Sequence, residues 1–444
     1  MDLTGLTALE LGERIARREV SSVEVTRAFL DRIAALDGEV GAFVSTRSSA
    51  LRDAAARDRE APRSPFHGVP VGVKDLDAVG GGFTRFGSRA TRWFWSPWDG
   101  PVAQRLRAAG FVLVGKTATS EFGAMSITEP DIGPPTRNPW NLDHTPGGSS
   151  GGAAAAVAAG MLPIAQGSDG GGSIRIPASF CHLYGFKPSR ATIPALYGGA
   201  DPLDLAFVGP LAHTVADGAA FVDVLVGRAP RSPPSPPSRK LRVCFATQSI
   251  LSETEPEIAE AVHGIAGLLE GLGHTVEEGG PPEGALDDFL PLWQFQLASL
   301  RFVRESVLQP VTRWLRQEGR RYSRAYVDQR RAELLARMAT WLGEADVWVF
   351  PTVAVSPPRV GESLGMDAEA QFRWAARLGA TTALFNLSGQ PAASVPYGIS
   401  AAGLPIGVQI VGRTDEDVLA VSASIEAARP WRHRRSPLAL RGVP

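Results

Sequence analysis

The feature that most constrains this fold is a series of short apolar segments that alternate with glycine-rich turns between residues 68 and 227. GVPVGV (68–73), FVLVG (111–115) and LPIAQG (162–167) are typical of buried strands, and AAAAVAAG (153–160) is typical of a closely packed helix. Strands that are apolar on both faces need helices on both sides of their sheet. The alternation therefore predicts an α/β fold whose sheet is largely covered.

The two ends of the chain show helical patterns. Near the N-terminus, Thr7 with Glu10 and Ser21 with Glu24 have the spacing of capping boxes, and apolar periodic stretches follow both pairs. Near the C-terminus, EDVLAVSASIEAARP (416–430) has the periodicity of an amphipathic helix. We expect helices at both ends, outside the strand-rich region.

A Pro/Ser tract, RAPRSPPSPPSRK (228–240), predicts an exposed, extended connector. Because strand-like and helical segments alternate again after it, we expect a surface excursion and not a domain boundary. We therefore expect a single domain over the whole chain. Its expected parts are N-terminal helices (1–60), a core (61–227), the connector (228–240), a mainly helical region (241–343) and a C-terminal return to the sheet (344–444).

The composition argues against several classes of function. A formal net charge of -1 provides no basic field for binding nucleic acid. No apolar run approaches the roughly 18 residues of a membrane-spanning helix, and no signal-peptide pattern is visible, so we expect a cytoplasmic protein without a membrane partner. Cys181 and Cys244 fit no metal-ligand spacing, and we expect two buried thiols, with a disulfide between them as the alternative. We expect neither a metal nor a cofactor.

Two segments match known sequence motifs, but we do not expect them to have the functions of those motifs. GFVLVGKT (110–117) fits the phosphate-loop pattern, but its middle residues are apolar and predict a buried strand where a phosphate loop has a turn. GGSSG (147–151) fits the nucleophile-elbow pattern, but the preceding NPWNLDHTP is polar and interrupted by proline, whereas an elbow follows a strand. A Ser–His–Asp enzyme stays only an alternative interpretation.

Lysine is rare in this chain. It occurs only at Lys74, Lys116, Lys187 and Lys240, so 41 of the 45 basic residues are arginine. A lysine side chain can lose its proton, whereas an arginine side chain in practice does not. Lys74 ends the apolar run GVPVGVKD (68–75), which predicts an amine in dry surroundings.

Two serines lie in glycine-rich turns. Ser149 lies in GGSSGG, which a small-residue helix follows directly, and Ser173 follows three glycines in GSDGGGSIRIP (167–177). Each segment alone fits a plain turn. Together with Lys74, they supply a nucleophile, a proton relay and a base. Glycines also let backbone N–H groups approach a reacting carbonyl closely, as an oxyanion hole requires.

The run GGSSGGAAAAVAAGMLPIAQGSDGGGSIRIPASFCHLYGFKPS (147–189) resembles the signature of the amidase signature family of serine hydrolases. The similarity extends over most of the chain and is loose only at 228–343. Its further segments are GVPVGVKDL, LVGKTATSEFG, RNPWNLDHTPGGSSGG, FVGPLAHTVADGA, NLSGQPAASVP and LPIGVQIVG. The resemblance implies one α/β/α domain with a large mixed, mainly parallel, twisted sheet covered by helices.

The resemblance also implies roles for individual residues. Ser173 would be the nucleophile, Ser149 would follow a cis peptide bond and relay the proton, and Lys74 would be the base. Backbone groups for the oxyanion would come from Gly170, Gly171 and Gly172, and supporting side chains from Ser150, Asp169 and Arg175. The chain departs from the family at Gly170, where many members carry a larger residue, and at His182, which we expect to pack where glycine is common.

The implied function is hydrolysis of carboxamide C–N bonds in small linear or cyclic amides. The tract TEPDIGPPTRNPWN (128–141) is similar to that of general amidases and aminohexanoate-dimer hydrolases. Three alternatives stay open: the amidase subunit of a glutamyl-tRNA amidotransferase, an esterase, and a non-catalytic binding protein. A homodimer is also left open.

We expect loops around 121–137 and the 285–390 region to form the substrate pocket. Phe122, Met125 and Asn386 are candidates for its lining, with core packing as the alternative for each.

Overall fold

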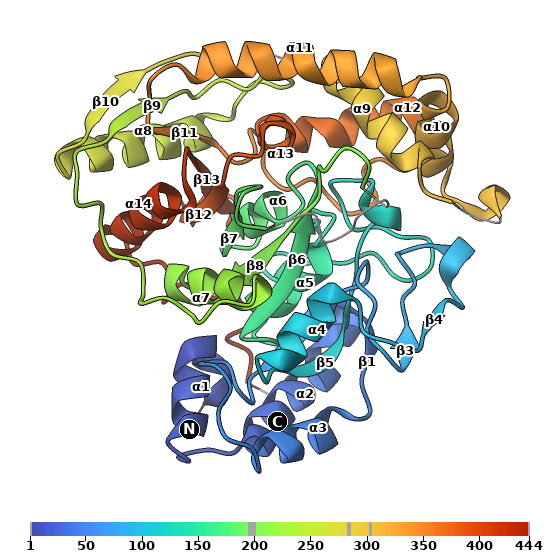
Figure 1. The fold of residues 1–444 in the computed structure, drawn as a ribbon, viewed down its shortest axis with the longest axis vertical. Helices are drawn as coiled ribbons and strands as arrows, with labels where there is room; N and C mark the ends of the chain where they lie inside the picture. The colour runs from blue at the N-terminus through green and yellow to red at the C-terminus, as the bar shows by residue number, and fades with distance from the viewer. Residues whose placement is uncertain (1, 194–200, 282–285, 302–303, 443–444) are drawn as a thin grey trace.

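The computed structural model describes residues 2–193, 201–281, 286–301 and 304–442. Within them the chain forms an 11-stranded sheet in the order β1-β5-β2-β6-β8-β7-β12-β13-β11-β9-β10, with helices around it (Figure 1). The strands are β1 (Phe43–Thr46), β2 (Pro70–Lys74), β5 (Val112–Thr117), β6 (Ile164–Asp169), β7 (Tyr184–Lys187), β8 (Phe207–Ala212), β9 (Arg242–Phe245), β10 (Thr275–Glu278), β11 (Val347–Pro351), β12 (Ala392–Ile399) and β13 (Pro405–Gly412). Strands β3 (Gly82–Phe83) and β4 (Trp95–Ser96) form a separate hairpin.

The expected α/β fold with a large mixed sheet is confirmed. Parallel pairs join β5 to β2, β2 to β6, β11 to β9 and β9 to β10, towards the two flanks of the sheet. The centre, from β6 to β11, is antiparallel, so parallel pairing is less extensive than expected. Strands β12 and β13 show the reason, because the short connection 400–404 joins them without a crossover helix.

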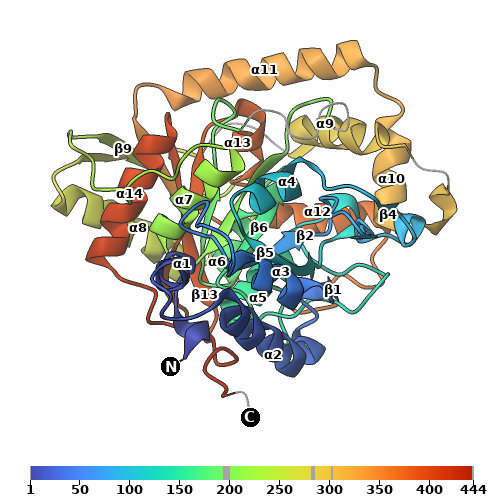
Figure 2. The same cartoon turned by 60° about the horizontal axis from the view of Figure 1, so that its bottom comes forward.

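Two groups of helices lie at opposite ends of the molecule, and the other helices lie between them around the sheet. The helices are α1 (Ala8–Ala16), α2 (Ser22–Val40), α3 (Ala50–Arg57), α4 (Pro101–Ala108), α5 (Gly151–Ala158), α6 (Arg175–Phe180), α7 (Val215–Leu225), α8 (Pro256–Gly271), α9 (Leu286–Ala298), α10 (Pro310–Gly319), α11 (Arg324–Leu342), α12 (Ala368–Ala376), α13 (Ala383–Ser388) and α14 (Asp415–Ala428). Helices α1 to α3 lie at the bottom of Figure 1, and α9 to α12 lie at its top. The turned view in Figure 2 keeps α2 and α11 at opposite ends.

The N-terminal capping boxes are confirmed. The side chains of Thr7 and Ser21 accept from the backbone of Glu10 and Glu24, whose carboxylates accept in return. The expectation that residues 1–60 are wholly helical is wrong at β1, a short strand that pairs antiparallel with β5 at the edge of the sheet. Four residues at a sheet edge leave too short a pattern to distinguish from a loop between helices.

Other expectations are tested by individual segments. The phosphate-loop match is a fully buried strand, β5, as predicted. Cys181 is a buried free thiol, but Cys244 is only partly buried, so the expectation of two buried thiols is wrong for it. Every helix in the described part of the chain is too short or too polar to cross a lipid bilayer.

Helix α5 places one of the predicted site serines. All its residues are buried, because it consists only of glycine, alanine and valine and packs on β2, β6 and β8. A Cβ atom at Gly152 would lie 2.3 Å from the backbone nitrogen of Ala118. The lack of side chains therefore lets this helix lie against β5 and its continuation, with Ser149 and Ser150 just before its first turn.

Candidate active site

Lys74 is the last residue of β2 and has no exposed surface. Its Nζ atom donates hydrogen bonds to Ser149 Oγ (2.7 Å) and to the carbonyl oxygen of Ser168 (3.1 Å). Its backbone N–H donates to the side chain of Gln166 (2.8 Å) on the neighbouring strand β6. The strand therefore holds the amine at one place, facing the serine turns.

The surroundings of Lys74 favour the uncharged amine. Burial lowers its pKa to about 7, against the opposing effect of the carboxylates of Asp77 and Asp169. An ammonium group that loses its water shell is penalised, whereas the neutral amine is not. A substantial share of Lys74 side chains is therefore neutral near neutral pH and able to accept a proton.

Ser149 lies in a turn that is packed from all sides. The peptide bond between Gly148 and Ser149 is cis, as the resemblance implied. The hydroxyl group of Thr128 donates to the carbonyl oxygen of Gly147 (2.9 Å) and accepts from the N–H of Gly151 (3.1 Å), which fixes both sides of Ser149. Ser149 is buried, with 2% of its surface exposed.

Ser173 lies between β6 and α6, beside the Ser149 turn. Its carbonyl oxygen accepts a hydrogen bond from the N–H of Ser150 (3.2 Å), and the hydroxyl of Ser150 donates to Ser168 O (3.0 Å). Both Ser149 and Ser173 line one cavity, although no hydrogen bond joins their hydroxyls among the described residues. Such contacts are often long without substrate and tighten when it binds.

The glycine turn before Ser173 is shaped by Asp169. The N–H of Gly172 donates to Asp169 Oδ1 (2.6 Å) and is therefore already engaged within the turn. The N–H groups of Gly170, Gly171 and Ser173 are the remaining candidates. Gly172 has φ of 126°, a conformation that side-chain-bearing residues rarely adopt.

We expect Gly172→Ala to lower kcat by about 100-fold, because the turn that carries Ser173 must shift. The added Cβ atom would lie 2.2 Å from Thr382 Oγ1 and 2.7 Å from Ile176 Cδ1. Gly171→Ala is the matched control, because its Cβ atom would meet nothing nearer than Ala383 Cβ at 3.8 Å. Steady-state kinetics of both variants test this, and equal kcat values for the two would contradict it.

Asp169 and Arg175 form a fully buried ion pair at 2.9 Å. Burial alone would raise the pKa of Asp169. The positive charge of Arg175 and the hydrogen bonds from Arg175 and Asn386 outweigh burial and hold this pKa well below its usual range. Arg175 also donates to Gln409, Asn386 and the carbonyl oxygen of Thr382. The pair therefore ties the Ser173 turn to β13 and α13.

Of the pocket candidates, Phe122 and Met125 line cavities beside Ser173, whereas Asn386 binds Asp169 and Arg175. His182 is buried and packs edge-on against Trp140, and burial lowers its pKa to about 4. The expectation that His182 packs is therefore confirmed.

Trp293 was not expected at the site. It belongs to α9, in the region that resembles the family only loosely, and its ring would lie 3.2 Å from a Cβ atom at Gly170. The indole therefore lies against the position where many family members carry a larger residue. In the sequence, only the glycine at position 170 indicates that another side chain packs there. It does not identify the segment that supplies that side chain.

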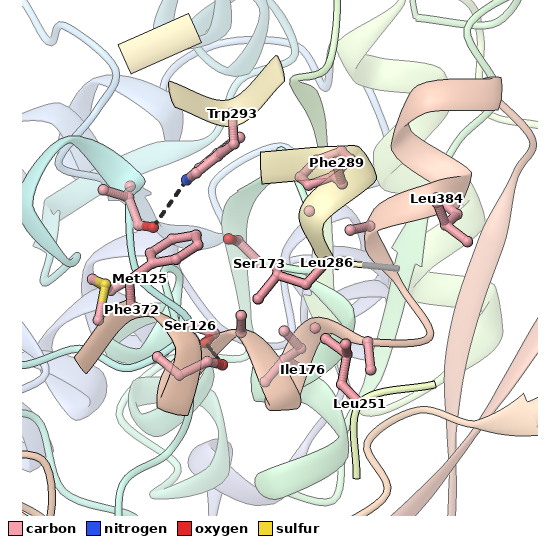
Figure 3. Close-up of a pocket in the computed structure, with 18 of the residues that line it drawn as sticks. Met125, Ser126, Ser173, Ile176, Leu251, Leu286, Phe289, Trp293, Phe372 and Leu384 are labelled. Carbon is pink, nitrogen blue, oxygen red and sulfur yellow. Dashed lines mark hydrogen bonds between the residues drawn. The ribbon is translucent and has the colours of Figure 1, made fainter. Parts of the chain in front are cut away.

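Two cavities meet at Ser173. The first is lined mainly by apolar side chains, among them Phe289 of α9 and Phe372 of α12 (Figure 3). The second is lined by Ser149, Phe122 and other residues. Ser173, Gly123 and Trp293 line both cavities and form their border.

The chain resembles known proteins along almost its whole length. The amidase family profile matches residues 24–421. The chain is 35% identical over 475 residues to 6-aminohexanoate-cyclic-dimer hydrolase from Pseudomonas sp., covering 96% of this chain and 95% of that protein. The solved structure of 6-aminohexanoate cyclic dimer hydrolase with substrate has a TM-score of 0.88 at 31% identity, covering 99% of this chain and 100% of that chain. A bacterial aryl acylamidase has a TM-score of 0.86 at 26% identity, covering 98% and 99%. The chain therefore belongs to the amidase signature family.

Proposed function

We propose that this protein hydrolyses carboxamide C–N bonds through an acyl-enzyme on Ser173, with Ser149 as proton relay and Lys74 as base. The observation that carries the proposal is the buried Lys74 Nζ atom, 2.7 Å from Ser149 Oγ, beside a cavity that both serines line. A non-catalytic protein has no need for an amine with a pKa near 7 beside a serine hydroxyl.

In the acylation step, neutral Lys74 accepts the Ser149 proton while Ser149 accepts the proton of Ser173. The Ser173 oxygen attacks the amide carbonyl, and backbone N–H groups of Gly170, Gly171 and Ser173 stabilise the oxyanion. The C–N bond then breaks as Ser149 returns a proton to the leaving nitrogen. Water next attacks the Ser173 ester by the same proton route, which releases the acid and restores the hydroxyl.

The cavity beside Ser173 bears on the alternative of a glutaminase subunit. Among the residues that the structure describes, no charged side chain lines the first cavity. The ammonium and carboxylate groups of glutamine would lose water there without a partner. The same chemistry also cleaves esters, so a substrate panel that pairs each amide with its ester decides between amidase and esterase.

We expect the protein to hydrolyse nitroanilides of apolar acids with kcat/KM that rises with pH to a plateau above about 7, where Lys74 is neutral. Below that pH, protonation of Lys74 lowers kcat/KM about tenfold per pH unit. A pH–rate profile with a nitroanilide tests both the activity and the base. The absence of amide hydrolysis at every pH would refute the proposed function.

A further inference from the structure

The two cavities at Ser173 differ in their relation to the proposed proton relay. Ser149 lines the second cavity, together with Phe86 and Phe122, but not the first. The group that receives a proton from Ser149 is the leaving nitrogen, so the amine half of the substrate must lie on the side of Ser149. This step rests on the proposed function.

We propose that the first cavity binds the acyl group and the second binds the amine, so that the substrates are amides of uncharged, apolar acids with aromatic amines. The term acyl cavity is used below for the first and amine cavity for the second.

Apart from Ser173, the polar side chains that line the acyl cavity in the described part of the chain are already engaged. Ser126 donates its hydroxyl proton to the carbonyl oxygen of Ala375 (2.5 Å), and Trp293 Nε1 donates to Ala124 O (3.3 Å; Figure 3). Phe372 and Phe289 supply apolar wall. An acyl group bound here gains from burial of its hydrocarbon and finds no partner for a charge among the described residues.

The amine cavity is also lined by the polar side chains of Asp201 and Gln296. The carboxylate of Asp201 accepts hydrogen bonds from the backbone N–H groups of Leu205 (3.0 Å) and Ala206 (2.7 Å), so it is already engaged within its own loop.

The rest of the amine cavity has an aromatic wall with unusual backbone geometry. Phe86 and Phe122 have φ values of 52° and 50°, in the left-handed region that bulky residues rarely adopt. The N–H of Phe122 donates to Phe86 O (2.8 Å), and the two rings stack with centroids 6.1 Å apart. Strained backbone of this kind concentrates at ligand sites, where the fold holds a side chain for its function.

The aromatic wall continues to the surface. The ring of Phe86 lies 5.9 Å from that of Phe94, which precedes β4 and has 50% of its surface exposed. Aromatic side chains thus lead from the Ser149 side of the site to solvent. A flat aromatic amine can stack against them, whereas a small amine such as ammonia would leave the wall without contact.

Two substrate series and two variants test the assignment. The acyl series varies chain length from acetyl to decanoyl on one nitroaniline, and the amine series joins hexanoyl to aniline or cyclohexylamine. We expect wild-type kcat/KM to rise about fourfold per methylene until the acyl cavity is full, and succinyl to be disfavoured about 100-fold relative to pentanoyl.

Phe372→Leu is expected to raise the decanoyl-to-hexanoyl ratio of kcat/KM about tenfold and to leave the aniline-to-cyclohexylamine ratio unchanged, because it enlarges only the acyl cavity. Phe122→Leu is expected to lower the aniline-to-cyclohexylamine ratio about fivefold and to leave the acyl ratios unchanged. Tyr326→Leu, on exposed α11, is the matched control and should leave every ratio unchanged. Crossed effects, or equal hydrolysis of succinyl and pentanoyl amides, would overturn the assignment.

Alkyl fluorophosphonates separate this inference from the proposed function. The Ser173 oxygen forms a bond to phosphorus, fluoride leaves, and the Ser173 proton passes through Ser149 to Lys74. The reagent has no leaving amine, so the rate of labelling reports the acyl cavity alone. Its chain-length dependence should change in Phe372→Leu and not in Phe122→Leu. If the wild type hydrolyses no amide but is labelled, the amidase function fails while the labelling rates still confirm or overturn the acyl assignment.

Discussion

Replacing Lys74 with arginine is expected to lower kcat by about 10⁴-fold, although a basic side chain of approximately the same length is kept. A guanidinium group is never deprotonated in proteins, so it cannot accept the Ser149 proton. It can still donate to Ser149 Oγ and Ser168 O, as Lys74 does at 2.7 Å and 3.1 Å. The loss would therefore come from basicity and not from a missing contact.

Lys116→Arg is the matched control for this variant. Lys116 is also nearly buried, on the adjacent strand β5, where it pairs with Asp75 at 2.9 Å. If Lys74→Arg acted only by crowding the interior, Lys116→Arg would lower kcat and the melting temperature to a similar extent. Lys74→Met adds a second comparison, because it removes the base without adding volume. Near-normal amide turnover by Lys74→Arg would exclude the proposed base.

Ser173→Ala should reduce kcat by about 10⁶-fold and abolish formation of the acyl-enzyme, because no other group on this turn can form the ester. Intact-mass measurement after incubation with a fluorophosphonate should show one added phosphonyl group on the wild type and none on the variant. The fold should persist, because the change removes one hydroxyl from a residue at a cavity.

Ser179→Ala is the control for Ser173→Ala. Ser179 is a buried serine in α6, on the helix that follows Ser173. This variant should be labelled at the wild-type rate. Labelling of Ser173→Ala at a comparable rate would assign the nucleophile to another residue.

The sequence predicted the site better than the surroundings of the site. Lys74, at the end of an apolar run, lies 2.7 Å from Ser149 Oγ, and the two glycine-bounded serines line one cavity. The rarity of lysine, however, does not distinguish a base from other buried lysines. Lys116 is paired with Asp75, and Lys187 is buried over the ring of Phe207. What distinguishes Lys74 from these lysines is its hydrogen bond with Ser149, a residue that only the folded structure brings close to it.

Other parts of the site depend on packing between segments far apart in the chain. The use of the Gly172 N–H by Asp169 follows from the bend of one turn, and its glycine-rich sequence permits many bends. Trp293 reaches Gly170 from α9, which has no recognisable signature. The antiparallel centre of the sheet likewise depends on which strands become neighbours, and the alternation of strands and helices does not fix this.

The side chains proposed to react lie on a strand and two turns, whereas Phe372 and Phe289 of the cavity wall lie on helices, and this has a consequence for engineering. Lys74 and the serine turns are locked into the interior, whereas Phe372 and Phe289 belong to helices at the other end of the molecule from α1 to α3. Libraries confined to the positions of Phe289 and Phe372 can therefore diversify the acids that this scaffold accepts without changing Lys74, the serine turns or Trp293, which packs at Gly170. Selectivity and reactivity are here two separately adjustable properties of one chain.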